Sequence, residues 1–405
     1  MAFRFIPNKE FDVIVKMSRV MVLLCVSLCG ACSAEVGDAV DFEKPAGLGE
    51  TTDFEEAQAA EDAFAAEEPE AEGQEATAQV SEALTRSVRF KGVNLASAEF
   101  GMDPEGWGAI GTHGKEYVYP IPSLAGGYDS ASYYVKKKMN TFRLPFRWER
   151  LQPSRKRPFN TAELGRLRAT VKHLTAKGAF VVIDPHNYAR YTTQVIGSGV
   201  PIADFADFWG RLAAQFKGNK RVIFGIMNEP YDIPTEQWVR AANAAIVAIR
   251  KTGATNLVLV PGNAWTGAHS WTQDWYGTPN SKALLAIKDS RNNYAFEVHQ
   301  YLDANFSGTS GNCPNATAPT QAMQEFTKWL RKYKKRGFLG EFSGGDSPVC
   351  LSALDNLLRH MEQNRDVYLG WTYWAGGPWW GNGLSLEPNG RTDKRQMDVL
   401  ERYMK

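Results

Sequence analysis

The sequence has no long apolar run and lacks familiar metal and phosphate motifs. Its most apolar stretch, residues 20–29, is about half as long as a helix that crosses a bilayer, so no transmembrane helix is predicted. The pattern His-Glu-x-x-His does not occur among the six histidines, and no glycine-rich phosphate loop follows the first predicted strand. We therefore predict neither a metal nor any other cofactor.

Net charge is also small, because 46 basic residues balance 45 acidic ones to a total of +1 over 405 residues. The balance hides a segregation: residues 33–85 hold 16 acids and one base, whereas residues 86–405 carry a net charge of +14. The basic runs at 136–138 and 334–336 fall on predicted outer helices, where charged side chains are usually solvated. We expect no nucleic-acid partner.

The first 32 residues have the pattern of an export signal. The apolar run 20–29 follows Lys16 and Arg19, as in the hydrophobic region of a signal peptide. One interpretation is an ordinary secretory signal that is cleaved near Ala34. The other is a lipoprotein signal, because small residues precede Cys32 as in a lipobox, and Cys32 would then be lipid-modified. In both cases we expect a secreted protein, with membrane attachment only through a lipid anchor at Cys32.

Residues 33–87 are predicted to be a disordered acidic segment. Alanine and glutamate dominate it, and its charge is almost entirely of one sign. Such a composition buries too little apolar surface to offset the entropy lost on folding. We interpret the segment as a linker or as a pro-segment that export removes, with a plain solubilising spacer as the alternative.

From residue 88 to residue 405, short β-branched or aromatic runs alternate with amphipathic stretches. This alternation favours a parallel sheet of the α/β class, and eight units in about 320 residues fit a (β/α)8 TIM barrel. A doubly wound open sheet is the alternative, but it usually carries a glycine-rich turn after its first strand. The predicted strands are 90–95, 141–146, 180–186, 222–229, 256–261, 295–301, 337–342 and 367–374.

Polar residues collect at the carboxyl ends of these strands, where the active sites of such barrels lie. Two of them are glutamates, Glu229 on the fourth strand and Glu341 on the seventh. Facing carboxylates suit glycosidic bond cleavage, because one donates a proton to the leaving oxygen while the other attacks or activates water. We expect Arg143 and Tyr301 to keep Glu341 ionised, and Glu229 to hold its proton longer.

Seven motifs at these strand ends resemble those of glycoside hydrolase family 5, the (β/α)8 retaining glycosidases that include many endoglucanases. The resemblance covers roughly residues 88–405, which would then be the catalytic domain. The motifs are Gly92-Val93-Asn94-Leu95, Phe142-Arg143-Leu144-Pro145, Asp184-Pro185-His186-Asn187, Asn228-Glu229-Pro230, His299-Gln300-Tyr301, Gly340-Glu341-Phe342 and Trp371-Thr372-Tyr373-Trp374.

The resemblance implies that Glu229 is the acid/base and Glu341 the nucleophile. The run from Gly262 to Trp271 looks like the subfamily of bacterial and fungal β-1,4-endoglucanases. The other candidate site residues would bind substrate or support the two glutamates: Asn94, Arg143, His186, Asn228, Trp265, His299, Tyr301 and Trp374.

Tryptophan is concentrated near the predicted site, with seven of the 12 residues at or after the fifth and eighth strands. Flat aromatic rings suit the apolar faces of sugars, so a row of them implies a long groove and a polymeric substrate. We predict a secreted endo-β-1,4-glucanase that cleaves cellulose and soluble β-glucans with retention. The alternatives are another β-glycanase, acting on mannan, xyloglucan or mixed-linkage glucan, and a non-catalytic carbohydrate-binding barrel.

Cysteine is rare in the predicted barrel, where only Cys313 and Cys350 occur. They lie in predicted loops after the sixth and seventh strands, which are neighbours in a barrel, and export permits their oxidation. We therefore predict that they form a disulfide. We expect the enzyme to be a monomer.

Overall fold

The computed structural model describes residues 87–101, 110–381 and 383–404. The predicted signal peptide, the lipidation site at Cys32 and all of the acidic segment before Ser87 lie outside these residues. Within them, every helix is too short or too polar to cross a membrane.

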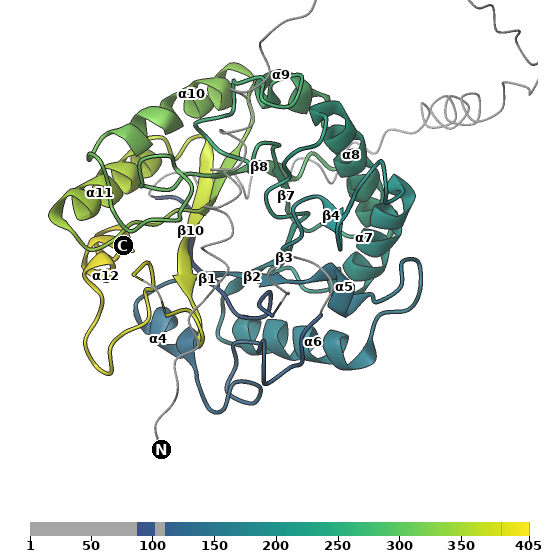
Figure 1. The fold of residues 1–405 in the computed structure, drawn as a ribbon, viewed down its shortest axis with the longest axis horizontal. Helices are drawn as coiled ribbons and strands as arrows, with labels where there is room; N and C mark the ends of the chain where they lie inside the picture. The colour runs from purple at the N-terminus through teal and green to yellow at the C-terminus, as the bar shows by residue number, and fades with distance from the viewer. Residues whose placement is uncertain (1–86, 102–109, 382, 405) are drawn as a thin grey trace, which may run out of the picture. The chain divides into compact units, whose positions relative to one another are not determined.

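Eight parallel strands close into a barrel, as the sequence predicted (Figure 1). Around the barrel they lie in the order β1, β10, β9, β8, β7, β6, β3 and β2. A two-stranded antiparallel hairpin, β4 (Arg190–Tyr191) and β5 (Gln194–Val195), follows β3 outside the barrel. The barrel strands are β1 (Phe90–Leu95), β2 (Thr141–Phe146), β3 (Phe180–Pro185), β6 (Val222–Gly225), β7 (Val258–Pro261), β8 (Tyr294–His299), β9 (Gly337–Glu341) and β10 (Tyr368–Gly376).

Helices surround the barrel and cover the outer face of its strands (Figure 1). Their apolar residues recur with helical spacing, so that Phe205, Trp209 and Leu212 of one helix are all buried against the sheet side. Side chains cap some of them, as where Asn160 accepts a hydrogen bond from the Glu163 amide. The α-helices are α4 (Ser130–Lys136), α5 (Trp148–Leu151), α6 (Thr161–Ala176), α7 (Ile202–Phe216), α8 (Thr235–Lys251), α9 (Asn280–Ala283), α10 (Ala318–Lys332), α11 (Pro348–Gln363) and α12 (Arg395–Leu400).

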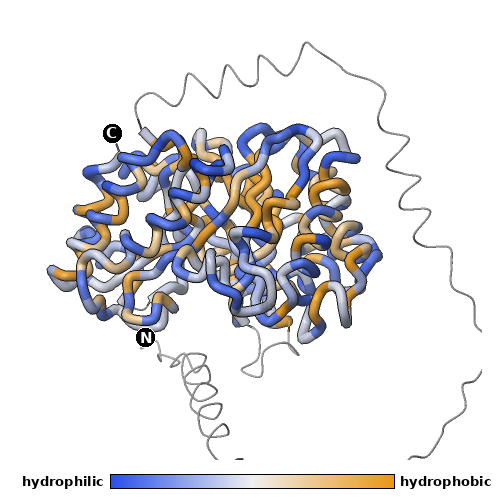
Figure 2. Tube along the Cα trace, turned by 90° about the horizontal axis from the view of Figure 1, so that it is seen from above, coloured by the Kyte–Doolittle hydropathy of each residue, from blue (hydrophilic) through white to orange (hydrophobic). Residues whose placement is uncertain are grey.

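The interior of the barrel is apolar at the amino ends of its strands. Six side chains from six strands form one buried cluster there, which we call the apolar plug. Successive residues of a strand point to opposite faces, so the residues between them join the larger core that lies between sheet and helices. Figure 2 shows several hydrophobic segments of the chain side by side in the middle of the view. The plug consists of Phe90, Val182, Ile223, Leu259, Ala295 and Phe338.

Six of the eight predicted strands differ from the structure at one or both ends, β6 by four residues and the others by one or two. β6 ends at Gly225 rather than at residue 229, because Glu229 has a φ of +40°, which a strand does not allow. β8 ends at His299, two residues earlier than predicted. The last α-helix, Arg395–Leu400, is continued by a 3-10 turn, η3 (Glu401–Tyr403).

The predicted disulfide is present between Cys313, in the loop after β8, and Cys350, in the first turn of α11. The two Cα atoms are 5.2 Å apart. The bond therefore joins the segments that follow two neighbouring barrel strands, β8 and β9.

Candidate active site

The two glutamates face each other at the carboxyl end of the barrel. Glu341 is the last residue of β9, and Glu229 lies shortly after the end of β6. One carboxylate oxygen of each, together with one ring nitrogen of His299, lie within 4.8 Å of one another. The two carboxyl groups of retaining glycosidases are about 5–5.5 Å apart, so the spacing fits that chemistry.

Glu341 is held by one cation and one phenol. Arg143 Nη1 donates to its Oε1 at 2.8 Å, and the Tyr301 hydroxyl donates to its Oε2 at 2.6 Å. We expected these contacts to keep Glu341 ionised. Burial instead raises the pKa of Glu341, and the charges of His299 and Arg143 only partly oppose the rise. Desolvation therefore outweighs the two favourable contacts.

Arg143 is the centre of a buried polar network. Its guanidinium is fully buried on β2, and burial would lower its pKa, but the surrounding carboxylates raise the pKa above its usual value. Because so many of its donors are matched by acceptors, the guanidinium has a fixed position. Its partners are Asn94 Oδ1 at 3.0 Å, Asn228 Oδ1 at 2.8 Å, Glu341 at 2.8 Å, Glu297 at 3.0 Å and Asp184 at 3.1 Å.

Asn94 and Asn228 have different positions in this network. Asn94 is fully buried, and its amide nitrogen donates to the Gly340 carbonyl at 2.9 Å, so it supports Arg143 from below. Asn228 contacts both Arg143 and His186, and it precedes Glu229 in the chain. Asn228 is therefore the better placed of the two to reach a sugar hydroxyl.

His186 is held in a single tautomer by its neighbours. Burial lowers its pKa well below the usual value, so the ring is neutral. Its Nδ1 lies 2.8 Å from Asp184 Oδ2, and its Nε2 lies 3.2 Å from the Asn228 amide nitrogen. Asn228 Oδ1 accepts from Arg143, so the Asn228 amide nitrogen donates to Nε2, and Nδ1 of the neutral ring carries the hydrogen that Asp184 accepts. The bond to Nε2 fixes the orientation of the Asn228 amide.

His299, unlike His186, is positively charged. Burial alone would lower its pKa, but the charge of Glu341 and hydrogen bonds with Glu229 and Glu297 outweigh burial and raise the pKa to about 10. Its Nδ1 is 2.7 Å from Glu229 Oε1 and 3.5 Å from Glu341 Oε2. The ring is therefore a cation at neutral pH, placed between the two glutamates.

The spacing of Glu229, His299 and Glu341 would by itself admit a metal ion. The raised pKa of His299 keeps a proton on the nitrogen that would have to bind such an ion. We therefore assign these three side chains to acid–base chemistry.

Two tryptophans flank the glutamates in matching ways. The Trp265 amide donates to the Pro230 carbonyl at 3.0 Å, and the Trp374 amide donates to the Phe342 carbonyl at 3.0 Å. Pro230 follows Glu229, and Phe342 follows Glu341, so each tryptophan is tied to the residue after one glutamate. The backbone of each tryptophan therefore lies beside the segment that carries one of the two glutamates.

The surroundings of the two rings differ. Trp374 is 8% exposed and stacks on His186 with ring centroids 5.4 Å apart, and Trp380 contacts its edge. Trp265 is 38% exposed and stacks on Tyr231, with centroids 4.9 Å apart and rings nearly parallel. The Arg190 guanidinium covers the Tyr231 ring at 4.0 Å. Trp265 is thus an exposed ring held by stacking on Tyr231, whereas Trp374 is buried among its aromatic neighbours.

Sequence reasoning missed Glu297, and Tyr231 with it. The period of a strand could have indicated Glu297, because residues i and i+2 point to the same face and His299 was already predicted to point inward. Asp184 has the same relation to His186. No comparable pattern marks Tyr231, whose position depends on the loop after β6.

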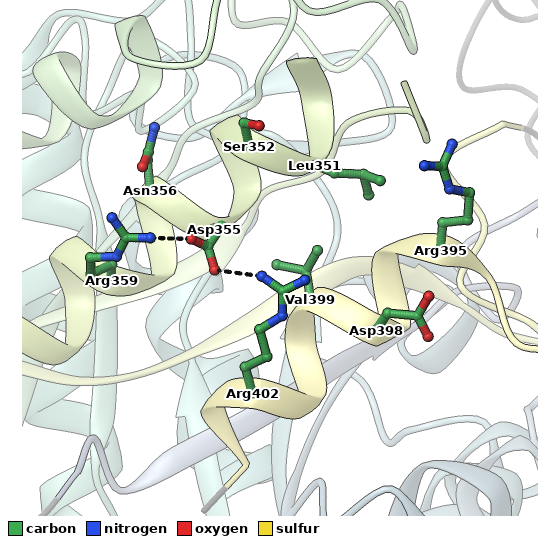
Figure 3. A pocket seen from close by; sticks show the side chains of 9 residues that line it. All are labelled: Leu351, Ser352, Asp355, Asn356, Arg359, Arg395, Asp398, Val399 and Arg402. Carbon is green, nitrogen blue, oxygen red and sulfur yellow. Dashed lines mark hydrogen bonds and ion pairs between the residues drawn. The ribbon is translucent and has the colours of Figure 1, made fainter. Parts of the chain in front are cut away.

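A concave region lies outside the barrel, between α11 and α12 (Figure 3). Arg359 and Arg402 both point at Asp355 there. Arg359 and Arg402 are exposed and Asp355 is partly buried, and they lie on the outer helical segments α11 and η3, remote in the fold from the strand ends. The region is not part of the candidate active site.

A (β/α)8 barrel with two facing carboxylates at the carboxyl ends of its strands has the architecture of a glycoside hydrolase. The family model described as cellulase, glycosyl hydrolase family 5, matches residues 126–377. Endo-beta-1,4-glucanase B of Aspergillus niger is 39% identical over 316 residues, which cover 77% of this chain and 89% of the fungal protein. Endoglucanase 3 of Humicola insolens is 39% identical over 74% of each chain.

Solved structures give the same result. A triple mutant of an endo-beta-1,4-glucanase from Xanthomonas axonopodis pv. citri matches with a TM-score of 0.74 and 46% identity, over 78% of this chain and 99% of that one. XacCel5A in complex with cellopentaose matches with a TM-score of 0.73 and 46% identity, over the same shares of the two chains. The chain therefore belongs to glycoside hydrolase family 5.

Proposed function

We propose that the chain is an endo-β-1,4-glucanase that cleaves internal bonds of β-1,4-glucan with retention of configuration. Glu341 is the nucleophile and Glu229 the acid/base. The observation that carries the proposal is the approach of the two carboxylates to within 4.8 Å, which leaves room for a glycosidic carbon but not for an additional water. Membership of family 5 and relatives named as endoglucanases support the choice of substrate.

In the first step, Glu341 Oε2 or Oε1 attacks the anomeric carbon and the bond to the leaving oxygen breaks. Glu229 gives its proton to that oxygen, so the leaving chain departs as an alcohol. Arg143 and Tyr301 donate to the two oxygens of Glu341 and favour the carboxylate that attack requires. The product is a glycosyl ester of Glu341.

In the second step, water attacks the same carbon from the side that the leaving chain vacated. Glu229, now a carboxylate, takes a proton from the water, and the ester bond to Glu341 breaks. Two displacements at one carbon restore its configuration. The enzyme returns to its starting state with Glu229 protonated and Glu341 ionised.

The neighbouring side chains orient the sugar. One amide hydrogen of Asn228 is used by His186, and the other is available to the 2-hydroxyl of the sugar, where a hydrogen bond strengthens in the transition state. Trp265 adjoins Pro230, so we place it on the leaving-group side, and we place Trp374 under the sugar that reacts. Platforms on both sides of the reacting bond favour an internal cut in a long chain.

Cellulose and soluble β-1,4-glucans are the substrates that the comparisons favour, since one solved relative holds cellopentaose. Mannan, xyloglucan and mixed-linkage glucan are the alternatives. We further propose that the enzyme is a monomer and acts after export, as its leader predicts.

The test is a reducing-sugar assay of the full chain on carboxymethylcellulose, galactomannan, xyloglucan and mixed-linkage glucan. We expect the highest kcat/KM on a β-1,4-glucan and an early fall in viscosity, as internal cleavage requires. Glu341→Ala is the control and should lose at least about 10⁴-fold in kcat. A folded wild-type chain that cleaves none of the four polymers would refute the proposal.

A further inference from the structure

Glu297 is a buried carboxylate that the proposed mechanism does not use. It lies on β8 two residues before His299, so both side chains point into the barrel. Glu297 is fully buried, and the barrel makes room for it at Gly340, where a Cβ atom would lie 2.1 Å from Glu297 Oε1. Any side chain at residue 340 would therefore collide with Glu297, which explains the glycine there.

One oxygen of Glu297 contacts two cations. Glu297 Oε1 is 3.3 Å from His299 Nε2 and forms an ion pair with Arg143 Nε at 3.0 Å. Burial alone would raise the pKa of Glu297, but the charge of Arg143 and the bond with His299 outweigh burial and lower it. Glu297 thus remains an anion in the barrel interior, directly behind the imidazole.

His299 is consequently bonded to a carboxylate at each ring nitrogen. Nε2 faces Glu297, and Nδ1 faces Glu229 at 2.7 Å. A carboxylate without a proton can only accept, so this arrangement needs a hydrogen on both nitrogens. The other charged or titratable groups around the ring are Glu341 of β9 at 3.5 Å and, at longer range, Asp184 of β3 and His186.

We propose that Glu297 is a positioning residue that acts through His299, keeping the imidazole doubly protonated so that its Nδ1–H holds Glu229 throughout the reaction. The inference rests on the proposed role of Glu229. When Glu229 gives its proton to the leaving oxygen, it becomes a carboxylate and continues to accept from Nδ1–H. When it takes a proton from water in the second step, the imidazole keeps both of its own protons.

Loss of the Glu297 charge would remove one of the anions that hold the second ring proton. His299 would then become neutral at a lower pH, and a neutral ring can present a lone pair to the Glu229 carboxylate. The second step, in which Glu229 must be an anion, would suffer first. The kinetic effect should therefore appear at alkaline pH and in kcat more than in KM.

The first test uses the wild-type full chain and needs no active substrate. Nitrogen-15 NMR of the histidine rings should show both His299 nitrogens protonated at pH 8, with the signal assigned by its loss in His299→Gln. A His299 ring that is neutral at pH 7 in the folded wild-type protein would overturn the inference. That outcome leaves the proposed hydrolysis standing, whereas an inactive enzyme with a doubly protonated ring would count against the proposed function alone.

The second test compares two isosteric variants, each of which removes one carboxylate that pairs with Arg143. Glu297→Gln also loses the contact with His299, whereas Asp184→Asn does not. We expect Glu297→Gln to move the alkaline limb of kcat/KM down by at least about one pH unit, with kcat at pH 8 about tenfold lower and KM within about twofold. Asp184→Asn should move that limb by less than half as much.

Equal shifts in the two variants would mean that Arg143, and not His299, carries the effect, and would overturn the inference. No shift in Glu297→Gln would do the same. If Glu297→Gln fails to fold, Glu297→Asp retains the charge at a shorter reach, and the wild-type NMR result still decides.

Discussion

The two ends of the barrel interior are built from the same strands but have different functions. The amino end holds the apolar plug, and the carboxyl end, which we call the mouth, holds the polar network. Along β8, Ala295 belongs to the apolar plug, while Glu297 and His299, the next inward residues, belong to the polar network at the mouth. The plug consists of aliphatic and aromatic side chains that only bury surface. The mouth holds charges that a barrel would not need for folding. A step of two residues along one strand thus separates the part that stabilises the fold from the part that does chemistry.

Burying charged groups at the mouth costs stability, as their shifted pKa values indicate. Burial raises the pKa of Asp184 to about 7, although Arg143 opposes the rise. Burial also raises the pKa of Glu99, in the loop after β1, to about 8. Groups that resist ionisation in the folded protein destabilise it once the pH forces them to ionise. The plug has no such groups, so the two ends should respond differently to mutation and to pH.

The largest expected effect comes from removing the proposed acid/base at the mouth. Glu229→Gln should lower kcat on β-1,4-glucan by about 10³-fold, because no group then protonates the leaving oxygen. On a dinitrophenyl cellobioside, whose leaving group needs no proton, the first step should be little affected. Azide should speed turnover there, since an anion needs no general base. An equal loss on both substrates, without an azide effect, would contradict the assignment of Glu229.

Truncating a side chain of the apolar plug should lower the stability of the fold without changing catalysis. Phe338→Ala removes a fully buried ring from the apolar plug, and should lower the free energy of unfolding by about 3–5 kcal/mol. Below the unfolding temperature, kcat should stay within about twofold of wild type. Denaturant titration and initial rates measure the two quantities on one sample, and a large fall in kcat at unchanged stability would break the comparison.

The pH dependence of stability should come from the mouth. The pKa of His299 is raised to about 10 in the folded protein, so its contribution is complete below about pH 6.5 and is lost as the pH rises towards 10. The raised pKa of Asp184 acts in the same direction between about pH 4 and 7. We expect unfolding free energy to fall with rising pH, by up to about 1.4 kcal/mol per unit for each group.

Thermal unfolding of wild type and Asp184→Asn across pH 4–10 measures this dependence. The variant should lose the contribution of Asp184 between pH 4 and 7, keep that of Glu99, and keep the part above pH 7. A stability that rises from pH 6 to pH 9 in the wild type would show that groups outside the mouth dominate.

The smallest expected effect concerns the exposed platform of the mouth. Trp265→Ala removes one stacking surface, worth about 1 kcal/mol, and should raise KM for long β-glucans about fivefold with kcat nearly unchanged. Val247→Ala, at an even more exposed apolar position on the outer face of α8, is the control and should change neither constant. An effect on kcat larger than that on KM would show that Trp265 contributes to the chemical step and not only to binding.

The sequence predicted the barrel and both glutamates because two regular patterns carry them. Strands and helices alternate along the chain, and parallel strands bring all their carboxyl ends to one face. Given that face, Glu229 and Glu341 had to be neighbours of the same opening, although 112 positions separate them in the chain. Even the disulfide followed, since β8 and β9 are adjacent.

Local backbone departures could not be predicted in the same way. Ala264, Trp265 and Thr266 have φ values of 54°, 53° and 50°, a left-handed turn that none of these residue types favours. Hydrogen bonds from distant parts of the barrel hold it, including one from the Thr266 hydroxyl to the Glu297 carbonyl at 2.5 Å. The stack of Trp265 on Tyr231 depends on that turn, so it emerges only from the folded structure.

Both ends of the described chain lie at the plug side of the barrel. Ser87 and Val88 bind Glu362 just before β1 begins at Phe90, and the Tyr403 carbonyl accepts a hydrogen bond from Lys91 at the start of the same strand. An affinity tag, a partner module or a bead coupled directly at residue 87 or residue 404 would therefore sit on the side of the barrel away from the two glutamates. Immobilised in this way, the protein should still present its two glutamates outward to an insoluble fibre.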